Sequence, residues 1–342
     1  MANNVTTPEL VAAVGEAGAL GSVGAPYYSA EEITRAAAEI RARTTKPFAL
    51  NLFIPLPAEE LDERTVANTR QILNAFRAEL GIAADPKPKA PSDVFDAQLE
   101  AVLRARPAVF SFTMGFPDRE RLRALRAEKI VTIGTATTTD EAVALEDAGI
   151  DVVCAQGSEA GGHRGSFLVP TEEGLFGITT LVAQIVRRVR VPVLAAGGIM
   201  DGRGIASALA SGAAGVQLGT AFLTCPEAGT ASAHKAALKS EAARRTVLTK
   251  AFSGRHGRAI ANRYTDAFAG MALPPFPSFL GATSDVRSTA AKQGRADLMQ
   301  LWAGQGAPLA RELPARELVA TLVREAHEAL AGVHRMQSVF AP

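Results

Sequence analysis

Short apolar runs recur along the chain, and most of them are followed by a stretch with the periodicity of an amphipathic helix. Seven such runs, each five to eight residues long, lie at 20–24, 48–55, 109–115, 130–136, 151–157, 191–198 and 215–220. Strands that are apolar along their whole length are buried on both faces, which is typical of parallel sheets. Their alternation with helices indicates βαβ units. The pattern therefore predicts an α/β fold with a parallel sheet.

The number of predicted strands bears on the type of α/β fold. The first helical pattern begins at Thr7 and Pro8, where a capping hydroxyl precedes a proline at the first helical position. No apolar run precedes it, whereas an eight-stranded barrel needs one more strand than the seven found. We expect a TIM (β/α)8 barrel whose first strand is missing or lies upstream of Met1, with an open sheet as the alternative.

The strand–helix rhythm stops after residue 220. Residues 226–300 read as helices and loops, with a proline-rich link at 272–279, and the last segment reads as amphipathic helix. We expect residues 1–225 and 301–342 to form the barrel and residues 226–300 to form an inserted helical lobe.

Composition narrows the possible functions. The 342 residues include 36 Lys and Arg and 35 Asp and Glu, a net charge of +1, so no basic excess favours nucleic acid or an anionic membrane. The uncharged stretch 204–226 is rich in Gly, Ser and Thr and reads as a small-residue helix and a strand. Cys154 and Cys225 form no CxxC pair, and the histidines form no metal-binding pattern. We therefore expect no metal site. The start, MANNVTTPEL, shows no signal peptide, so we expect a cytoplasmic location.

Glycines at the ends of two neighbouring strands form the first candidate site. Gly197 and Gly198 end the run 191–198, and Gly219 and Thr220 end the next run. Loops at this position of a barrel commonly hold a phosphate together with a helix N-terminus. The alternative is that these glycines only permit tight turns. The pattern does not separate FMN from a sugar phosphate.

The loop CAQGSEAGGHRGSF, residues 154–167, is the second candidate. Gln156 ends the strand 151–157, and Gly161 and Gly162 permit a close backbone approach before His163. Of the five histidines, only His163 lies on a predicted loop at the carboxyl ends of the strands, where barrel enzymes do their chemistry. Histidine is the commonest general base, so His163 is the candidate catalytic base. A purely structural loop histidine is the alternative.

Two further segments carry polar groups toward the same end. Asn51 is a polar residue in the apolar run 48–55, where it either reaches a ligand or braces its own loop. Trp302 and Gln305 lie in WAGQG, where the chain returns from the lobe. That segment either covers a cofactor or makes a simple domain-return turn.

These strings together resemble a known family. QGSEAGGHRGSF (156–167), AAGGIMDGRG (195–204), VQLGTAFL (216–223), NLFIP (51–55) and WAGQG (302–306) are similar to the nitronate monooxygenases, and HRGSF, NLFIP and WAGQG are closest to class I. The resemblance implies a barrel that holds non-covalent FMN, with His163 as catalytic base and Met1 at the end of the first strand, near the flavin. It implies FMN contacts at Asn51, Gln156, Gly161, Gly198, Gln217, Leu218, Gly219 and Thr220.

The implied activity is the FMN-dependent oxidation of alkyl nitronates, such as propionate 3-nitronate, by O2 to a carbonyl compound and nitrite or nitrate. His163 would deprotonate a neutral nitroalkane. The same superfamily contains FMN-dependent NAD(P)H reductases of quinones or enoyl thioesters, which is the main alternative. A non-redox phosphate-site barrel, or a flavin-less binding protein, is a third. The segment 278–288 and the C-terminal helix offer surface for a possible homo-oligomer.

Overall fold

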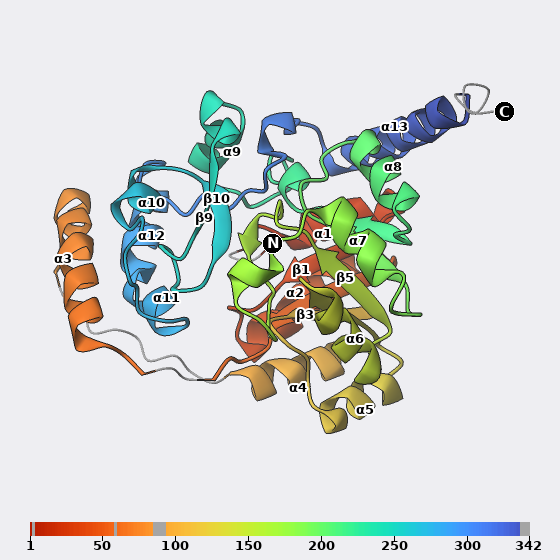
Figure 1. The fold of residues 1–342 in the computed structure, drawn as a ribbon, viewed down its shortest axis with the longest axis horizontal. Coiled ribbons are helices and arrows are strands. Elements are labelled where there is room, and N and C mark those ends of the chain that lie inside the picture. The colour runs from red at the N-terminus through yellow and green to blue at the C-terminus, as the bar shows by residue number, and fades with distance from the viewer. Residues whose placement is uncertain (2–3, 58–59, 85–93, 336–342) are drawn as a thin grey trace.

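A curled, seven-stranded parallel sheet forms the centre of the protein (Figure 1). The computed structural model describes residue 1 and residues 4–57, 60–84 and 94–335. Each predicted apolar run contains one strand of this sheet, so the prediction of seven strands is confirmed. In spatial order the strands are β1 (Gly21–Gly24), β2 (Phe48–Phe53), β3 (Val109–Thr113), β4 (Val131–Ala136), β5 (Val152–Gln156), β7 (Val193–Ala196) and β8 (Gly215–Gln217).

The two edges of this sheet are β1 and β8, and residues near the N-terminus lie between them. Thr6 Oγ1 accepts a hydrogen bond from the Gly24 amide at the end of β1 (2.9 Å). The carbonyl of Val5 accepts one from Gly229, in the segment after β8 (3.0 Å). Residues 5 and 6 therefore connect the carboxyl end of β1 to the segment that follows β8.

Helices cover the outer face of the sheet, as the βαβ pattern predicts. Phe110 and Phe112 of β3 point outward into the main core, whereas Ser111 between them points inward, in the alternation expected of a strand. The predicted cap formed by Thr7 is confirmed, and Ser29 and Glu32 form a capping box at the start of α2. These helices are α1 (Pro8–Glu16), α2 (Ala30–Arg43), α4 (Phe95–Ala105), α5 (Arg119–Ala127), α6 (Thr139–Asp147), α7 (Ile178–Ile185), α8 (Gly202–Ala210) and α13 (Ala315–Arg335).

A second body packs beside the barrel around its own apolar core. Residues 226–300 form short helices joined by loops there, and they add two short strands that the apolar pattern did not reveal. The elements are α9 (Ser232–Leu238), β9 (Thr246–Thr249), β10 (Gly257–Ile260), α10 (Arg263–Ala267), α11 (Ser278–Ala282) and α12 (Ser284–Lys292). Short 3-10 helices complete the fold at η1 (Thr171–Gly174), η2 (Thr220–Phe222), η3 (Glu241–Arg244) and η4 (Ala307–Leu309).

Helix α3 (Glu63–Leu80) belongs to the packing of this second body although it precedes it in sequence. Figure 1 shows α3 beside α10 and α12, away from the sheet. Leu73, Phe76 and Leu80 of α3 contribute to the core of the lobe. The domain boundaries at 225 and 301 remain a prediction, to which the packing adds α3 as a candidate part of the lobe.

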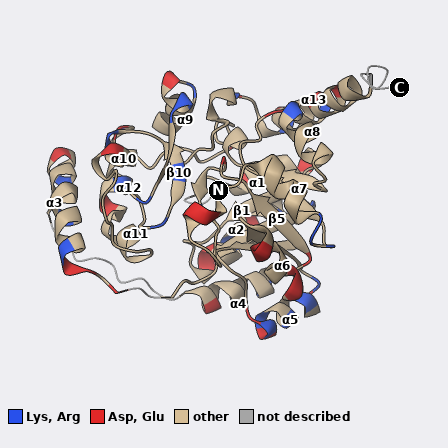
Figure 2. Ribbon diagram, in the orientation of Figure 1, with Lys and Arg blue, Asp and Glu red and all other residues tan. Residues whose placement is uncertain are grey.

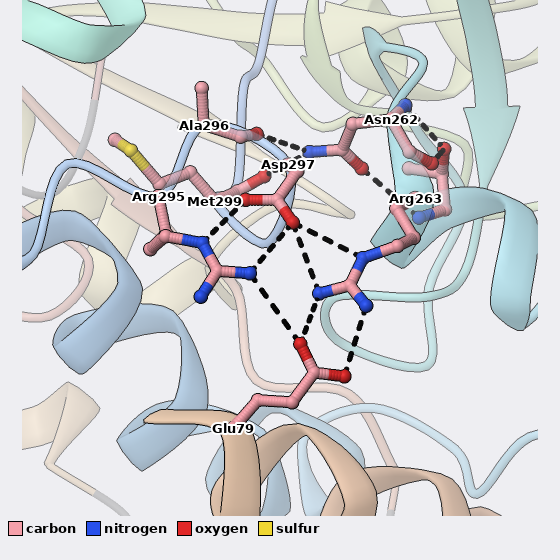
Figure 3. A network of polar contacts seen from close by, with 8 residues as sticks. Glu79, Asn262, Arg263, Arg295, Ala296, Asp297 and Met299 are labelled. Carbon is pink, nitrogen blue, oxygen red and sulfur yellow. Dashed lines mark hydrogen bonds and ion pairs between the residues drawn. The ribbon is translucent and has the colours of Figure 1, made fainter. Parts of the chain in front are cut away.

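A network of ion pairs fastens the end of α3 to the lobe (Figure 3). Glu79 binds Arg263 at 2.5 and 2.9 Å, and Asp297 bridges Arg263 and Arg295. Asn262 donates to two backbone carbonyls next to these groups. The charged side chains are partly exposed, so each pair adds little to stability and the set mainly fixes orientation.

Charged residues of both signs are interspersed on outer helices such as α3, α5 and α13, in keeping with the near-zero net charge (Figure 2). Within the described ranges, no helix is long and apolar enough to cross a bilayer. No group of His, Cys, Asp and Glu side chains suited to a metal ion is found in the same part of the chain.

Candidate active site

The polar residues singled out in the sequence gather at one end of the sheet, because the carboxyl ends of parallel strands lie at the same edge. Asn51 lies in β2, Gln156 ends β5 and Gln217 ends β8. Gly197 and Gly198 follow β7 directly, and His163 follows β5 on a short excursion of the chain. The fold therefore brings the predicted site residues to a common face.

Inward-pointing polar side chains pair across neighbouring strands below this face. Asn51 and Ser111 stand opposite each other in the register of β2 and β3, and the Asn51 amide donates to the Ser111 hydroxyl (2.9 Å). Cys154 of β5 donates to the Gln217 side chain of β8 over a longer distance (3.7 Å), although β7 lies between these two strands. The Asn51 side chain thus has a protein partner, and its carbonyl oxygen remains on the inner side of the sheet.

Gln156 fastens the loop that carries His163. Its Nε2 donates to the His163 carbonyl (3.0 Å), and its Oε1 accepts from the Gly165 amide (2.8 Å). One amide hydrogen and one lone pair of Gln156 remain beyond these two bonds. The side chain therefore positions the loop and still has one donor and one acceptor for a ligand.

His163 is held from the other side by the lobe. Gly162 and His163 form the two-residue strand β6, which pairs antiparallel with β10. Arg164 is fully buried behind it and donates to the carbonyls of Gly157 (2.5 Å), Gln156 (3.1 Å) and Gly174 (2.9 Å). The histidine loop is thus fixed both to the end of β5 and to a strand of the second body.

Aromatic rings surround the His163 imidazole. The ring centroids of Trp302, Phe53 and Phe276 lie 5.1, 5.7 and 5.8 Å from that of the imidazole, and Tyr27 packs on Phe53. Burial, together with the smaller effect of the positive charges of Arg255 and Arg287, lowers the pKa of His163 from 6.5 to about 3. At neutral pH the imidazole is therefore uncharged and able to accept a proton.

The glycine loops after β7 and β8 suit an anion, and the first of them lies next to the histidine loop. Gly197 and Gly198 adopt positive φ values of 136° and 68°. The backbone amides of Gly198 and Gly219 donate to none of the other residues that the structure describes. A cavity of about 330 Å³ lies beside the first loop, and its lining includes Glu159, Thr179, Gly197, Gly198, Ser207 and Gln305. The amides of Gly198 and Gly219 are donors of the kind that fit a phosphate group.

Helix α8, which follows the first glycine loop, has amides in its first turn that already have hydrogen-bond partners. The amides of Gly202 and Gly204 in the first turn of α8 donate to the carboxylates of Glu325 (3.1 Å) and Asp201 (2.8 Å). The two carboxylates already satisfy these donors and bring negative charge. The loop amides are therefore the better candidate donors, and the contribution of a helix N-terminus to the phosphate site remains a prediction.

The return segment WAGQG packs directly on the histidine loop. A Cβ atom on Gly161 would lie 2.5 Å from the Gly304 nitrogen, so only glycine permits this approach. The Gln305 amide donates to the Glu159 carbonyl (2.9 Å), and the Gly304 amide donates to Thr220 Oγ1 (3.0 Å). The Glu159 carboxylate itself caps α7 through the Ile178 amide, so this acid braces the loop. The segment therefore joins the histidine loop to the loop after β8.

Some residues of the site gave no signal in the sequence. Ser253, Phe276 and Arg287 come from the lobe, and Tyr27 follows β1. None of them lies in a glycine-rich or strand-end motif, so only the tertiary fold reveals them.

Met1 was expected near the flavin, and its side chain lies next to Gly219, 3.7 Å from where a Cβ atom on that residue would be. Leu218 lies between the apolar clusters on either side of β8.

The comparisons with known proteins agree with one another. The family model of the nitronate monooxygenases matches residues 1–325. A nitronate monooxygenase of Pseudomonas aeruginosa is 43% identical over 330 residues, which cover 94% of this chain and 93% of that protein. A probable nitronate monooxygenase of Staphylococcus haemolyticus is 39% identical over 324 residues, 94% of this chain and 90% of that protein.

Solved structures give the same picture. The nitroalkane oxidase of Streptomyces ansochromogenes superimposes with a TM-score of 0.92 at 42% identity, over 97% of this chain and 95% of that one. FabK of Thermotoga maritima gives a TM-score of 0.71 at 25% identity, over 96% and 92% of the two chains. The fold and these comparisons thus define an α/β-barrel oxidoreductase. The chain belongs to the nitronate monooxygenase family, whose members are flavin-dependent enzymes. Nitronate oxidation is the activity best supported, and a FabK-like reductase is supported less.

Proposed function

We propose that the protein uses FMN to oxidise alkyl nitronates with O2, and that His163 is its catalytic base. The observation that carries the proposal is the position of a neutral imidazole among aromatic rings, at the same end of the sheet as two glycine loops with available amides. One part of the face suits an anionic group of a cofactor, and the other holds a base in apolar surroundings.

The residues at this face fit FMN. The amides of Gly198 and Gly219 would hold the phosphate, with the Thr220 hydroxyl beside them. The side-chain amides of Asn51, Gln156 and Gln217 offer donors and acceptors of the kind that a flavin pyrimidine ring requires. Gly161, Gly162, Gly197, Leu218, Gln305 and Met1 remain proposed contacts on the same grounds of position. When bound, FMN supplies the electron transfer between the nitronate and O2.

The protein contributes a proton acceptor and a dry surrounding. For a neutral nitroalkane, the bond between the α-carbon and hydrogen breaks, its electron pair stays in the nitronate, and the proton forms a new N–H bond on His163. A nitronate supplied as such needs no base. Phe53, Phe276 and Trp302 limit the access of water to the imidazole and offer an apolar surface for an alkyl chain.

We propose small alkyl nitronates, including propionate 3-nitronate, as substrates, with a carbonyl compound and nitrite or nitrate as products. Arg255 and Arg287, whose positive charges act on His163, give this part of the site a potential that suits an anion. The cytoplasmic location and a homo-oligomeric state remain predictions.

An anaerobic absorbance spectrum of the purified protein tests the proposal. We expect a bound-flavin spectrum that NADH leaves unchanged and that propionate 3-nitronate alters. Rapid bleaching by NADH would favour the reductase of quinones or enoyl thioesters. A colourless protein that takes up no added FMN would contradict the proposed cofactor.

The base assignment needs a separate test. We expect His163→Ala to retain flavin and to oxidise a preformed nitronate, but to lose turnover of the parent nitroalkane by about 100-fold or more, the usual contribution of a general base. Equal turnover of the nitroalkane by the variant would show that His163 is not the base. His327, which is exposed on α13, provides the matched control as His327→Ala.

A further inference from the structure

A buried serine contacts the imidazole of His163. Ser253 is completely inaccessible to solvent, and its Oγ lies 2.7 Å from His163 Nε2. It belongs to the turn between β9 and β10, where the amides of Ser253 and Gly254 both donate to the Lys250 carbonyl. The backbone of this turn is thereby fixed, and the hydroxyl is held against the ring from the side of the lobe.

The contacts of the Ser253 hydroxyl decide which way the hydrogen bond runs. Its Oγ lies 3.3 Å from the carbonyl oxygen of Arg255 and 3.4 Å from the Arg255 amide nitrogen. A hydroxyl has one hydrogen and two lone pairs. The carbonyl oxygen can only accept, whereas a ring nitrogen of neutral histidine donates or accepts according to its tautomer.

Only one tautomer satisfies all three contacts of this hydroxyl. If Ser253 donates to the Arg255 carbonyl, it accepts from the Arg255 amide and from a protonated Nε2 of His163. If Ser253 donated to Nε2 instead, two acceptor oxygens would face each other at 3.3 Å with no hydrogen between them. The geometry favours the tautomer with its hydrogen on Nε2 and its lone pair on Nδ1.

We propose that Ser253 is a positioning residue, which accepts the Nε2 hydrogen of His163 and thereby presents the Nδ1 lone pair as the base. This inference rests on the proposed role of His163. During nitroalkane deprotonation the proton leaves the α-carbon and bonds to Nδ1, while the C–H electron pair stays in the nitronate. The Nε2 hydrogen keeps its bond to Ser253 throughout, so the imidazolium forms without rotation of the ring.

Nitrogen NMR of the holoenzyme labelled with ¹⁵N-histidine reads the tautomer directly, with no need for turnover. Comparison with the His163→Gln spectrum assigns the signals of His163. We expect a protonated Nε2 and an unprotonated Nδ1 in the unsubstituted protein, and a mixture of tautomers in Ser253→Ala. A protonated Nδ1 in the unsubstituted protein would overturn the inference, even if Ser253→Ala failed to fold.

Kinetics supply the second readout. In Ser253→Ala we expect kcat/KM for nitroethane to fall about tenfold, the usual worth of one such hydrogen bond, and kcat/KM for ethyl nitronate to stay within about twofold. Ser253→Thr keeps the hydroxyl and should restore much of the loss. Ser240→Ala, which removes a partly exposed hydroxyl elsewhere in the lobe, should change neither value.

The outcomes separate the two proposals. If His163→Ala deprotonates nitroethane as well as the unsubstituted protein does, the base assignment itself fails. If His163→Ala is inactive on nitroethane but Ser253→Ala lowers both substrates equally, His163 remains the base and the positioning role of Ser253 is wrong.

Discussion

Gln156 holds His163 by the backbone. Its amide donates to the His163 carbonyl at 3.0 Å and accepts from the Gly165 amide at 2.8 Å, so one side chain fixes the loop on both sides of Arg164. The register of the histidine loop relative to β5 therefore depends on a side chain that sequence reasoning assigned to the cofactor alone.

Replacement of this glutamine tests that dependence. We expect Gln156→Ala to lower kcat/KM for a nitroalkane by about tenfold or more, because two hydrogen bonds that position the loop are lost. Preformed nitronate should be affected less, since its oxidation needs no base. Equal loss with both substrates would mean that Gln156 acts on the cofactor and not on the loop.

The contact between Gly161 and the return segment predicts a steric effect. A methyl group in Gly161→Ala would meet the backbone of Gly304 and Ala303 at about 2.5 Å, and neither can move without displacing WAGQG. We expect a loss of stability of about 2 kcal/mol or more, measured by denaturant unfolding, together with weaker flavin retention. Gly270→Ala is the control, because it has positive φ but open space and should cost only about 1 kcal/mol.

The contacts of the buried Arg164 predict that a positive charge alone, as in lysine, would not preserve the stability of the fold. Its two terminal nitrogens reach three backbone carbonyls, and its pKa, lowered by burial to about 10, leaves it charged at neutral pH. Lysine keeps the charge but cannot span the same acceptors. We expect Arg164→Lys to lose about 2–3 kcal/mol in denaturant unfolding, since buried carbonyls lose their donors. Unchanged stability would contradict this account.

His234 predicts a pH dependence of stability. Burial lowers the pKa of this histidine from 6.5 to about 4. Between these values the unfolded chain binds a proton that the folded protein does not, so unfolding becomes more favourable as the pH falls from about 6.5 to about 4.

The variant His234→Gln should flatten this part of the stability curve. Urea unfolding at intervals between pH 7 and pH 4 measures it, with His327→Gln as the exposed control. An identical pH slope in His234→Gln and the unsubstituted protein would exclude His234 as a source of acid sensitivity.

Much of the barrel could be predicted from sequence because its strands are buried on both faces and therefore consist of uninterrupted apolar runs. The histidine loop was recognisable because glycines are required where Gly161 packs on Gly304. Strands β9 (TVLT) and β10 (GRAI) escaped detection because Thr and Arg interrupt their apolar residues, so neither forms the apolar run that marks a strand buried on both faces. Helix α3 has an ordinary amphipathic pattern, which cannot say which of two bodies covers its apolar face.

The partners of His163 were unpredictable for a related reason. Ser253 lies 90 residues away in sequence and meets the imidazole only because β6 pairs with β10. A lone serine in a turn carries no local pattern that distinguishes it from a solvated one. Long-range pairing, and not local propensity, decides such contacts.

Because β6 pairs with β10, residues of both the barrel and the inserted body surround the candidate base His163. The barrel offers the platform for a cofactor, whereas the inserted body supplies Ser253, Phe276 and Arg287 around the histidine. Changes confined to the inserted body can therefore retune which molecules react while the redox platform stays intact.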